Sequence, residues 1–248
     1  MPLGPTTAFV ADSWTSTQVV GHRGAAAYAP ENSLESFAAA IDSGVRAAEC
    51  DVHVSANGDV MVIHDSTLDR TTSLTGAVAQ TPSWEMIEAG VPTLDQLCDA
   101  VKGRLILVVE IKGGDGIEQL VVDSLAEYEM LDSSIVFSFS GDSVARVKSL
   151  EPRLYCVWLV GDNALSKEPE GALRSKLDQF QADAVGFSFY GVNKVLTTYL
   201  RGEKIPLFVW TIPPGPGVAQ LQSLRVNFII TNHPRDVLAQ LSEHTTQR

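Results

Sequence analysis

The hydrophobic positions along the chain follow two alternating patterns. Short runs rich in β-branched residues are typical of buried strands, and longer stretches with an apolar residue at every third or fourth position are typical of amphipathic helices. Regular alternation of the two is typical of parallel strands joined by crossover helices. The pattern predicts strands at residues 19–22, 47–54, 104–112, 134–139, 153–160, 182–187, 206–211 and 226–231.

The predicted helices cover residues 33–43, 94–101, 117–128, 143–150, 171–180, 194–200, 218–224 and 235–242. Eight strand and helix units favour a closed α/β barrel, the (β/α)8 TIM barrel, over an open doubly wound sheet. Barrels of this kind often hold about 250 residues in one domain. We therefore expect a single domain over residues 1–248, with the barrel at about 18–243.

One irregular stretch follows the second predicted strand. The pair Asn57 and Gly58 accepts the positive φ angles of a tight hairpin turn, so residues 60–64 are predicted to return as a strand. Residues 66–91 show only weak periodicity. We expect them to form a short insertion or cap near the barrel mouth.

The charge of the chain excludes some partners. There are 18 Lys and Arg against 30 Asp and Glu, which gives a net charge of -12, and no run of basic residues forms the stripe that nucleic acids or anionic membranes require. No apolar run approaches the roughly 18 residues of a membrane span. We expect a small-molecule substrate, no nucleic-acid partner and no stable membrane anchor. The sequence indicates no oligomeric state.

The first eighteen residues lack the basic and apolar segments of a secretory signal. Cys50, Cys98 and Cys156 lie far apart without CxxC spacing, so neither a disulfide framework nor a zinc site is indicated. A cytoplasmic protein with reduced cysteines in its core is the expectation.

Acidic side chains gather near the ends of two predicted strands, where barrels of this kind place their catalytic groups. Because side chains alternate along a strand, Glu49 and Asp51 share one face, and Glu110 and Lys112 share the face opposite residues 105, 107, 109 and 111. Crowded carboxylates suit an oxygen-preferring divalent cation, Mg²⁺ or Ca²⁺, and the sequence does not distinguish the two.

Two basic residues lie beside these acids. Arg23 follows the first predicted strand and Lys112 ends the third. Arginine can bind two phosphate oxygens at once, and lysine acts as a point charge, so a cation with these two groups describes a phosphate site. The alternative is that Arg23, Arg46 and Lys112 only neutralise the acids through ion pairs.

Two histidines also fall at the predicted mouth. His22 ends the first strand and His64 ends the returning strand. Their ordinary pKa, about 6.5, suits proton transfer near neutral pH, so they are candidates for an acid and a base. The alternative is that each is a structural residue.

Several motifs then occur in a fixed order: HRG at 22–24, PENS at 30–33, ExD at 49–51 and HDxxLxRTT at 64–72. This order closely resembles the glycerophosphodiester phosphodiesterase family. Further matches at 92–94, 110–112, 138–139 and 210–211 extend the resemblance over nearly the whole chain.

The resemblance implies a TIM barrel of the phospholipase-C-like phosphodiesterase type, which hydrolyses glycerophosphodiesters to sn-glycerol 3-phosphate and an alcohol with one divalent cation. It does not say which histidine is the acid, or whether water or a substrate hydroxyl is the nucleophile. The roles it implies are metal ligands at Glu49, Asp51 and Glu110, acid and base at His22 and His64, phosphate binding at Arg23 and Lys112, and supporting contacts from Glu31 and Asn32.

The chain departs from the family pattern at two positions. Pro213 stands where the pattern has Asn, and Asn232 where it has Asp. These changes remove a polar group and a charge from the mouth, so we expect them to alter substrate preference more than the reaction. The insertion is also shorter than usual. Phe139 and Trp210, at strand ends, are expected to line the pocket, where a choline head group could make a cation–π contact.

Two other functions are compatible with parts of this pattern. A phospholipase D-like or phosphoinositide-specific enzyme acting on a lipid or lysolipid would need an apolar rim, and the sequence shows no obvious one. A non-catalytic phosphodiester-binding barrel would not need the pair of histidines.

Overall fold

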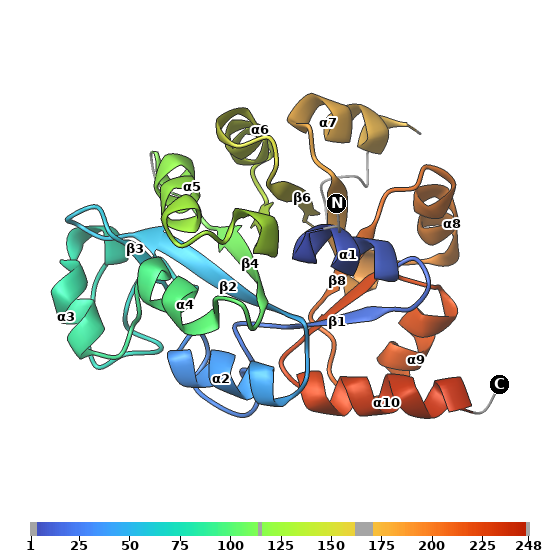
Figure 1. Cartoon of the computed structure of the whole chain (residues 1–248), viewed down its shortest axis with the longest axis horizontal. Coiled ribbons are helices and arrows are strands. Elements are labelled where there is room, and N and C mark those ends of the chain that lie inside the picture. Colours follow the sequence, from blue (N-terminus) through green and yellow to red (C-terminus); the bar gives the residue numbers. More distant parts are fainter. Residues whose placement is uncertain (1–3, 114–115, 162–170, 247–248) are drawn as a thin grey trace.

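The structure is a computed structural model that describes residues 4–113, 116–161 and 171–246. Its centre is a closed barrel of parallel strands (Figure 1). Neighbouring strands pair in chain order, and β1 pairs with both the second and the last strand of the barrel, which closes it. The predicted TIM barrel is confirmed. Its strands are β1 (Gln18–Gly21), β2 (Ala47–Val54), β4 (Ile106–Ile111), β5 (Ser134–Ser138), β6 (Tyr155–Val160), β7 (Ala184–Ser188), β8 (Leu207–Trp210) and β9 (Phe228–Thr231).

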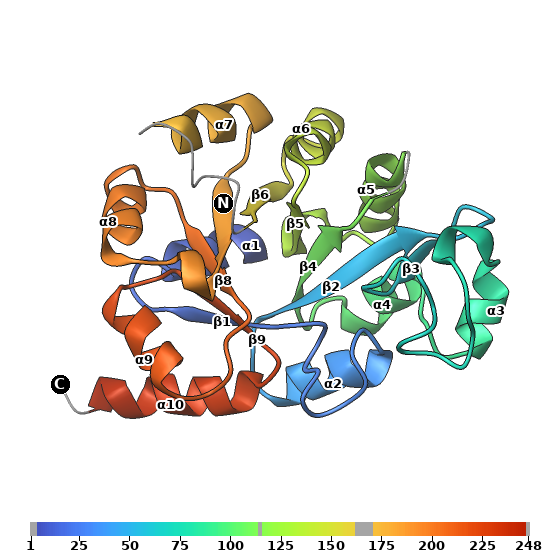
Figure 2. The ribbon, with the colours of Figure 1, turned by 180° about the vertical axis from the view of Figure 1, so that it is seen from behind.

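Helices surround this barrel in both views (Figures 1 and 2). Several begin at residues that cap them: the Thr93 and Gln96 side chains form a reciprocal capping box, and the Ser33 and Asn193 side chains accept backbone N–H groups. The surrounding helices are α2 (Leu34–Asp42), α4 (Leu94–Val101), α5 (Ile117–Glu127), α6 (Gly141–Leu150), α7 (Ala172–Phe180), α8 (Lys194–Gly202), α9 (Pro216–Ser223) and α10 (Pro234–Thr246).

The predicted elements are all present, with ends that shift by a few residues. The strand predicted at 104–112 spans only Ile106–Ile111, because the amides of Arg104 and Leu105 bond to Val101 O and so belong to the turn that ends α4. Short 3-10 helices, η1 (Val78–Gln80), η2 (Leu131–Ser133) and η3 (Phe189–Gly191), lie in the connections.

An N-terminal helix, α1 (Pro5–Asp12), was not predicted. Its Phe9 is buried and packs on Phe228 with ring centroids 5.1 Å apart, while Thr6 bonds to Ser134 O at the start of β5. Helix α1 therefore closes the end of the barrel where the strands begin, opposite the end where they finish.

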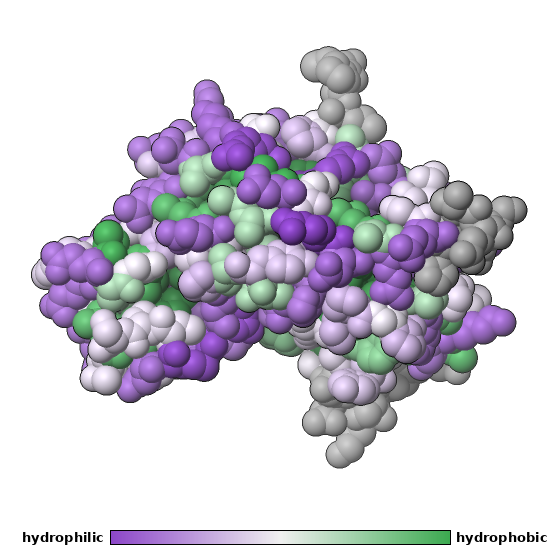
Figure 3. Space-filling model, turned by 90° about the horizontal axis from the view of Figure 1, so that it is seen from below, coloured by the Kyte–Doolittle hydropathy of each residue, from purple (hydrophilic) through white to green (hydrophobic). Residues whose placement is uncertain are grey.

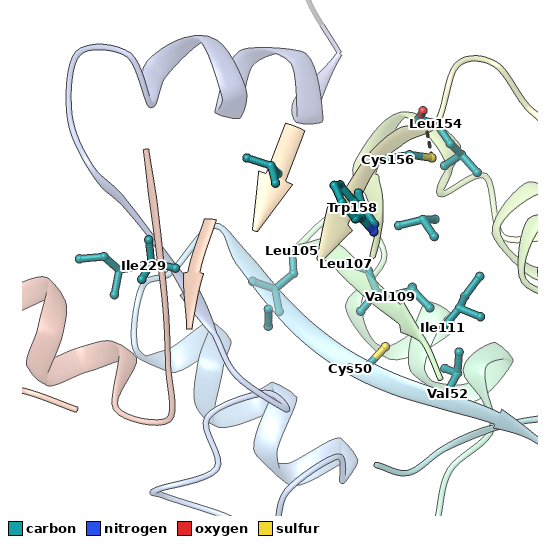
Figure 4. Close-up of a cluster of buried hydrophobic side chains, with 14 of the residues drawn as sticks. Cys50, Val52, Leu105, Leu107, Val109, Ile111, Leu154, Cys156, Trp158 and Ile229 are labelled. Carbon is teal, nitrogen blue, oxygen red and sulfur yellow. Dashed lines mark hydrogen bonds between the residues drawn. The ribbon is translucent and has the colours of Figure 1, made fainter. Parts of the chain in front are cut away.

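The barrel has two apolar layers separated by the alternation of side chains along each strand. Inside it, Ile106, Val108, Phe137, Phe208 and Phe228 pack with Phe9. Outside it, the alternate residues of the same strands pack against the helices, and Figure 4 shows part of this layer. The labelled members are Cys50, Val52, Leu105, Leu107, Val109, Ile111, Leu154, Cys156, Trp158 and Ile229. Cys50, Cys98 and Cys156 are free and buried, as expected.

The stretch after β2 begins with the predicted hairpin. Strand β3 (Val60–Val62) pairs antiparallel with β2, and a short helix, α3 (Ser83–Glu88), follows. In Figures 1 and 2, α3 lies at one side of the barrel beyond β3. A small apolar core of its own holds this stretch together, made of Met61, Ile63, Leu68, Val78, Met86 and Val91.

On the face seen in Figure 3, hydrophilic residues cover much of the surface and hydrophobic residues form patches between them. Among the described residues, no helix combines the length and the apolar composition needed to cross a membrane.

Candidate active site

Three carboxylates converge inside the barrel. Strands β2 and β4 pair in parallel so that Asp51 is opposite Glu110, and Glu49 lies one inward position earlier on β2. All three side chains are buried, and one carboxylate oxygen from each lies within 4.8 Å of the others. Residues 105, 107, 109 and 111 belong to the outer layer, so the predicted division between the two faces is confirmed.

Two cations contact these acids. Lys112 Nζ lies 2.9 Å from Asp51 Oδ1 and 2.5 Å from Glu110 Oε1, and Arg23 Nε lies 3.3 Å from Asp51 Oδ2. The predicted ion pairs are therefore present for Lys112 and Arg23. It is wrong for Arg46, whose guanidinium instead pairs with Asp12 of α1 at 2.6 Å.

No described Lys or Arg side chain forms an ion pair with Glu49, in contrast to Asp51 and Glu110. Burial, together with the charges of Asp51 and Glu110, raises the pKa of Glu49 well above its usual range. Burial acts on Asp51 in the same sense, but Lys112 and Arg23 outweigh it and leave the pKa of Asp51 lowered. Glu49 Oε1 is buried and accepts no hydrogen bond from any described residue. An orphaned carboxylate oxygen beside two further carboxylates fits a divalent cation.

The loop after β1 fixes the positions of several of these groups. Arg23 N donates to Glu49 Oε2 at 2.9 Å, and Asn32 Nδ2 donates to Asp51 Oδ2 at 2.9 Å. Both Arg23 and Asn32 have positive φ angles, 50° and 58°, which non-glycine residues rarely adopt. The backbone is thus strained at the two residues that hold the acids, as is common at functional sites.

Close backbone packing in this loop requires glycine at position 24. Gly24 has φ of 81°, and a Cβ there would lie 2.6 Å from the carbonyl carbon of Ser36 and 2.4 Å from its Oγ. We expect Gly24→Ala to lower the free energy of unfolding by about 2–4 kcal/mol, from the unfavourable φ and the collision together. Denaturant titration measures this.

Gly44 is the matched control for that variant, because it also has φ of 81° but has open space where a Cβ would be. Gly44→Ala should cost only about 1 kcal/mol, the contribution of φ alone. Equal losses in the two variants would show that the approach of Ser36 does not matter.

The two predicted histidines have different partners. His22 Nδ1 donates to Asn232 Oδ1 at 2.6 Å, and His22 Nε2 lies 3.9 Å from Glu49 Oε2. His64 Nδ1 donates to Asp65 Oδ1 at 2.6 Å. Burial, with the nearby charge of Arg23, lowers the pKa of His22 to about 4. One imidazole is thus held by a neutral amide and the other by a carboxylate.

Arg70 joins the two sides of the site, and this connection was not predicted. Its guanidinium donates to both oxygens of Glu31, at 2.7 and 2.9 Å, and to both oxygens of Asp65, at 2.6 and 3.1 Å. Glu31 also accepts from Arg23 at 2.8 Å. The hydrogen bonds from Arg70 and then from His64 lower the pKa of Asp65. A continuous chain of hydrogen bonds and ion pairs therefore runs from His64 to Arg23.

Most of the predicted site residues line one cavity of about 160 Å³ at the end of the barrel where the strands finish. Phe139 and Trp210 form one wall of it, with ring centroids 5.7 Å apart in an edge-to-face contact. Glu31 and Asn32 instead line a neighbouring cavity that also includes His64. The residues of the first cavity are His22, Arg23, Glu49, His64, Glu110, Lys112, Phe137, Phe139, Leu159, Trp210, Thr211 and Ile230.

Comparisons with known proteins find relatives that match this chain over most of its length. A glycerophosphodiester phosphodiesterase of Caldanaerobacter subterraneus is 28% identical over 240 residues, which cover 90% of this chain and 96% of that protein. A crystal structure of a glycerophosphodiester phosphodiesterase from Agrobacterium tumefaciens matches with a TM-score of 0.75 and 26% identity, covering 90% of this chain and 99% of that one.

A phosphodiesterase from Oleispira antarctica, in complex with the product sn-glycerol-3-phosphate, shares the fold with a TM-score of 0.80 at 21% identity over 93% of this chain and 99% of that one. The sequence model of the glycerophosphoryl diester phosphodiesterase family matches residues 22–236, which include every predicted site residue. The chain belongs to this family.

Proposed function

We propose that the protein hydrolyses glycerophosphodiesters to sn-glycerol 3-phosphate and an alcohol, with a divalent cation and a pair of histidines. The observation that carries this proposal is that two cations, two histidines and two buried carboxylates line one cavity, with the third carboxylate, Asp51, directly beside them. The family membership and the product bound to the Oleispira relative support the substrate class.

Glu49, Asp51 and Glu110 would hold the cation, Mg²⁺ or Ca²⁺. When bound, such an ion neutralises phosphoryl charge and lowers the pKa of a coordinated hydroxyl group. The protein itself supplies the other positive charges: Arg23 and Lys112 face the cavity and can bind the non-bridging phosphate oxygens, whose charge grows in the transition state.

The hydrogen-bond partners of the histidines favour one assignment of acid and base. His22 donates Nδ1–H to the neutral Asn232, lies beside the Arg23 cation and is largely buried, so its neutral form is favoured and Nε2 is free to accept a proton. His64 donates Nδ1–H to the Asp65 carboxylate, so its partner is a charged group and the partner of His22 is a neutral one. We therefore assign His22 as the base toward the nucleophile and His64 as the acid toward the leaving alcohol.

Arg70 orients the proposed acid without touching the substrate. Arg70→Ala should lower kcat for glycerophosphocholine about tenfold with little change in KM, because Asp65 and Glu31 lose their shared partner while the phosphate-binding groups remain. Steady-state kinetics over a range of pH check this, since a change in the pH at which activity falls indicates an effect on His64.

The matched control for Arg70→Ala is Arg153→Ala. It removes another exposed arginine, which pairs with Glu151 and precedes β6 at the end of the barrel opposite the cavity. It should leave kcat and KM unchanged. An unaltered pH profile in Arg70→Ala, with kcat reduced, would mean that Arg70 does not act through His64.

Release of glycerol 3-phosphate from glycerophosphocholine and glycerophosphoethanolamine tests the proposed function. The purified protein is assayed as prepared, with EDTA, and after Mg²⁺ or Ca²⁺ is restored. We expect release that EDTA abolishes and one of the two ions restores. No release from folded protein with either ion, together with stoichiometric binding of the diester, would instead indicate a non-catalytic binding barrel.

A further inference from the structure

A second cavity adjoins the first on the side of the barrel away from His64. It has a volume of about 560 Å³ and lies between the loop that follows β7 and the loop that follows β8. Trp210 and Thr211 line both cavities, so the two are adjacent and share one wall. We call this second cavity the β7–β8 groove. Its lining residues are Ser188, Phe189, Tyr190, Trp210, Thr211, Ile212, Pro213, Pro214, Pro216, Gly217 and Gln220.

The β7–β8 groove is mainly apolar. None of the described residues that line it is charged, and proline and aromatic side chains make up much of its wall. Tyr190 stands out at the rim with 92% of its surface exposed, and its ring packs against Phe189 at 5.7 Å between centroids. Phe139, across the shared Trp210, is 48% exposed. Exposed aromatic side chains grouped at an open cavity are typical of a site that an apolar ligand covers.

The position of the groove relative to His64 indicates which part of the substrate can reach the groove. His64 follows β3, on the side of the barrel where α3 lies. The groove is lined by residues at the ends of β7 and β8 and at the start of α9, and α9 lies on the other side of the barrel (Figures 1 and 2). If His64 protonates the leaving alcohol, that alcohol lies toward β3. The glycerol that keeps the phosphate then lies toward Trp210 and the groove.

We propose that the β7–β8 groove binds an apolar chain attached to the glycerol, so that the preferred substrates are glycerophosphodiesters carrying one acyl or alkyl chain. This inference rests on the proposed function, because it uses the assigned direction of the leaving group. It also supplies the apolar rim that the sequence did not reveal. Tyr190 and Phe189 carry no obvious strand or motif signal, and only the fold places them beside Trp210.

The test compares kcat/KM for glycerophosphocholine with kcat/KM for 1-hexanoyl-glycerophosphocholine, a chain short enough to avoid micelles. Burying several methylenes should raise kcat/KM at least about tenfold. Tyr190→Ser should remove most of that gain and leave glycerophosphocholine turnover unchanged. Val195→Ser is the matched control, because Val195 is 81% exposed on α8 but does not line the groove, and it should keep the full preference.

A third substrate separates the two possible origins of the chain: a glycerophosphodiester whose leaving alcohol is hexanol. We expect Tyr190→Ser to leave kcat/KM for this substrate unchanged. A loss of kcat/KM in that variant would overturn the assignment of the groove to the glycerol side. Equal kcat/KM for glycerophosphocholine with and without the hexanoyl chain would overturn the proposal as a whole.

A binding measurement keeps this inference separate from the proposed function. By calorimetry, 1-hexanoyl-glycerol 3-phosphate should bind at least about tenfold more tightly than glycerol 3-phosphate, and Tyr190→Ser should abolish the difference. This result would support the groove even in a protein that turns over no diester. Equal affinities of the two ligands would refute the groove whether or not the enzyme is active.

Discussion

Glu49→Gln is expected to lower kcat/KM for glycerophosphocholine by about 10³-fold or more, because it removes one of the three carboxylates proposed to hold the cation. The same change should not destabilise the protein in the absence of metal. Burial and the charges of Asp51 and Glu110 raise the pKa of Glu49, and Gln has the shape of the protonated acid without a charge to bury. Kinetics and thermal unfolding, each with and without Mg²⁺ or Ca²⁺, measure both effects.

The thermal data distinguish a metal ligand from a residue needed for folding. The unaltered protein should gain Tm when the ion is added, because a ligand that binds only the folded state stabilises it, and Glu49→Gln should lose most of this gain. Glu85→Gln, at an exposed position on α3, is the control and should keep both the gain and the activity. A full metal-induced rise of Tm in Glu49→Gln would exclude Glu49 as a ligand.

The sequence predicted the inner face of the barrel well, because side-chain alternation in a strand is a local property. Glu49, Asp51, Glu110 and Lys112 were placed by counting in twos from apolar neighbours, and the register of β2 against β4 brought them together. Helix α1 was missed for the opposite reason. It has only eight residues and almost no amphipathic pattern, and Phe9 is buried only because the open end of a barrel needs filling.

The hydrogen-bond partners of the site could not be predicted from spacing. His22 and Asn232 are 210 positions apart, and they meet because β1 and β9 are neighbours in the closed barrel. Arg70 was visible within a motif, but nothing local shows that one guanidinium reaches both Asp65 and Glu31. The sequence indicated only that Asn232 removes a charge from the mouth. The structure shows that its side chain accepts the hydrogen bond from His22 Nδ1.

The proposed acid and base should respond differently to the leaving group of the substrate when each histidine is replaced. His64→Gln should lower kcat for glycerophosphocholine by about 10²–10⁴-fold, the usual contribution of a general acid or base. For a diester with p-nitrophenol as leaving group the loss should be much smaller, because that group departs without a proton. His22→Gln should impair both substrates equally, because a base toward the nucleophile is needed whatever leaves. The ratio of kcat for the two substrates in each variant is the measurement.

Conservative variants separate these roles from misfolding. Asn232→Asp places a carboxylate on His22 Nδ1, which should raise the pKa of His22 and move the acidic limb of the kcat/KM profile to higher pH, because the base must then lose its proton at a higher pH. Asp65→Asn should reduce kcat for glycerophosphocholine and largely spare the nitrophenyl diester, since it removes the carboxylate that holds His64 Nδ1. If His22→Gln instead kept most of its kcat for the nitrophenyl diester and His64→Gln did not, His22 would be the acid and His64 the base. The glycerol would then lie on the side of the barrel toward β3.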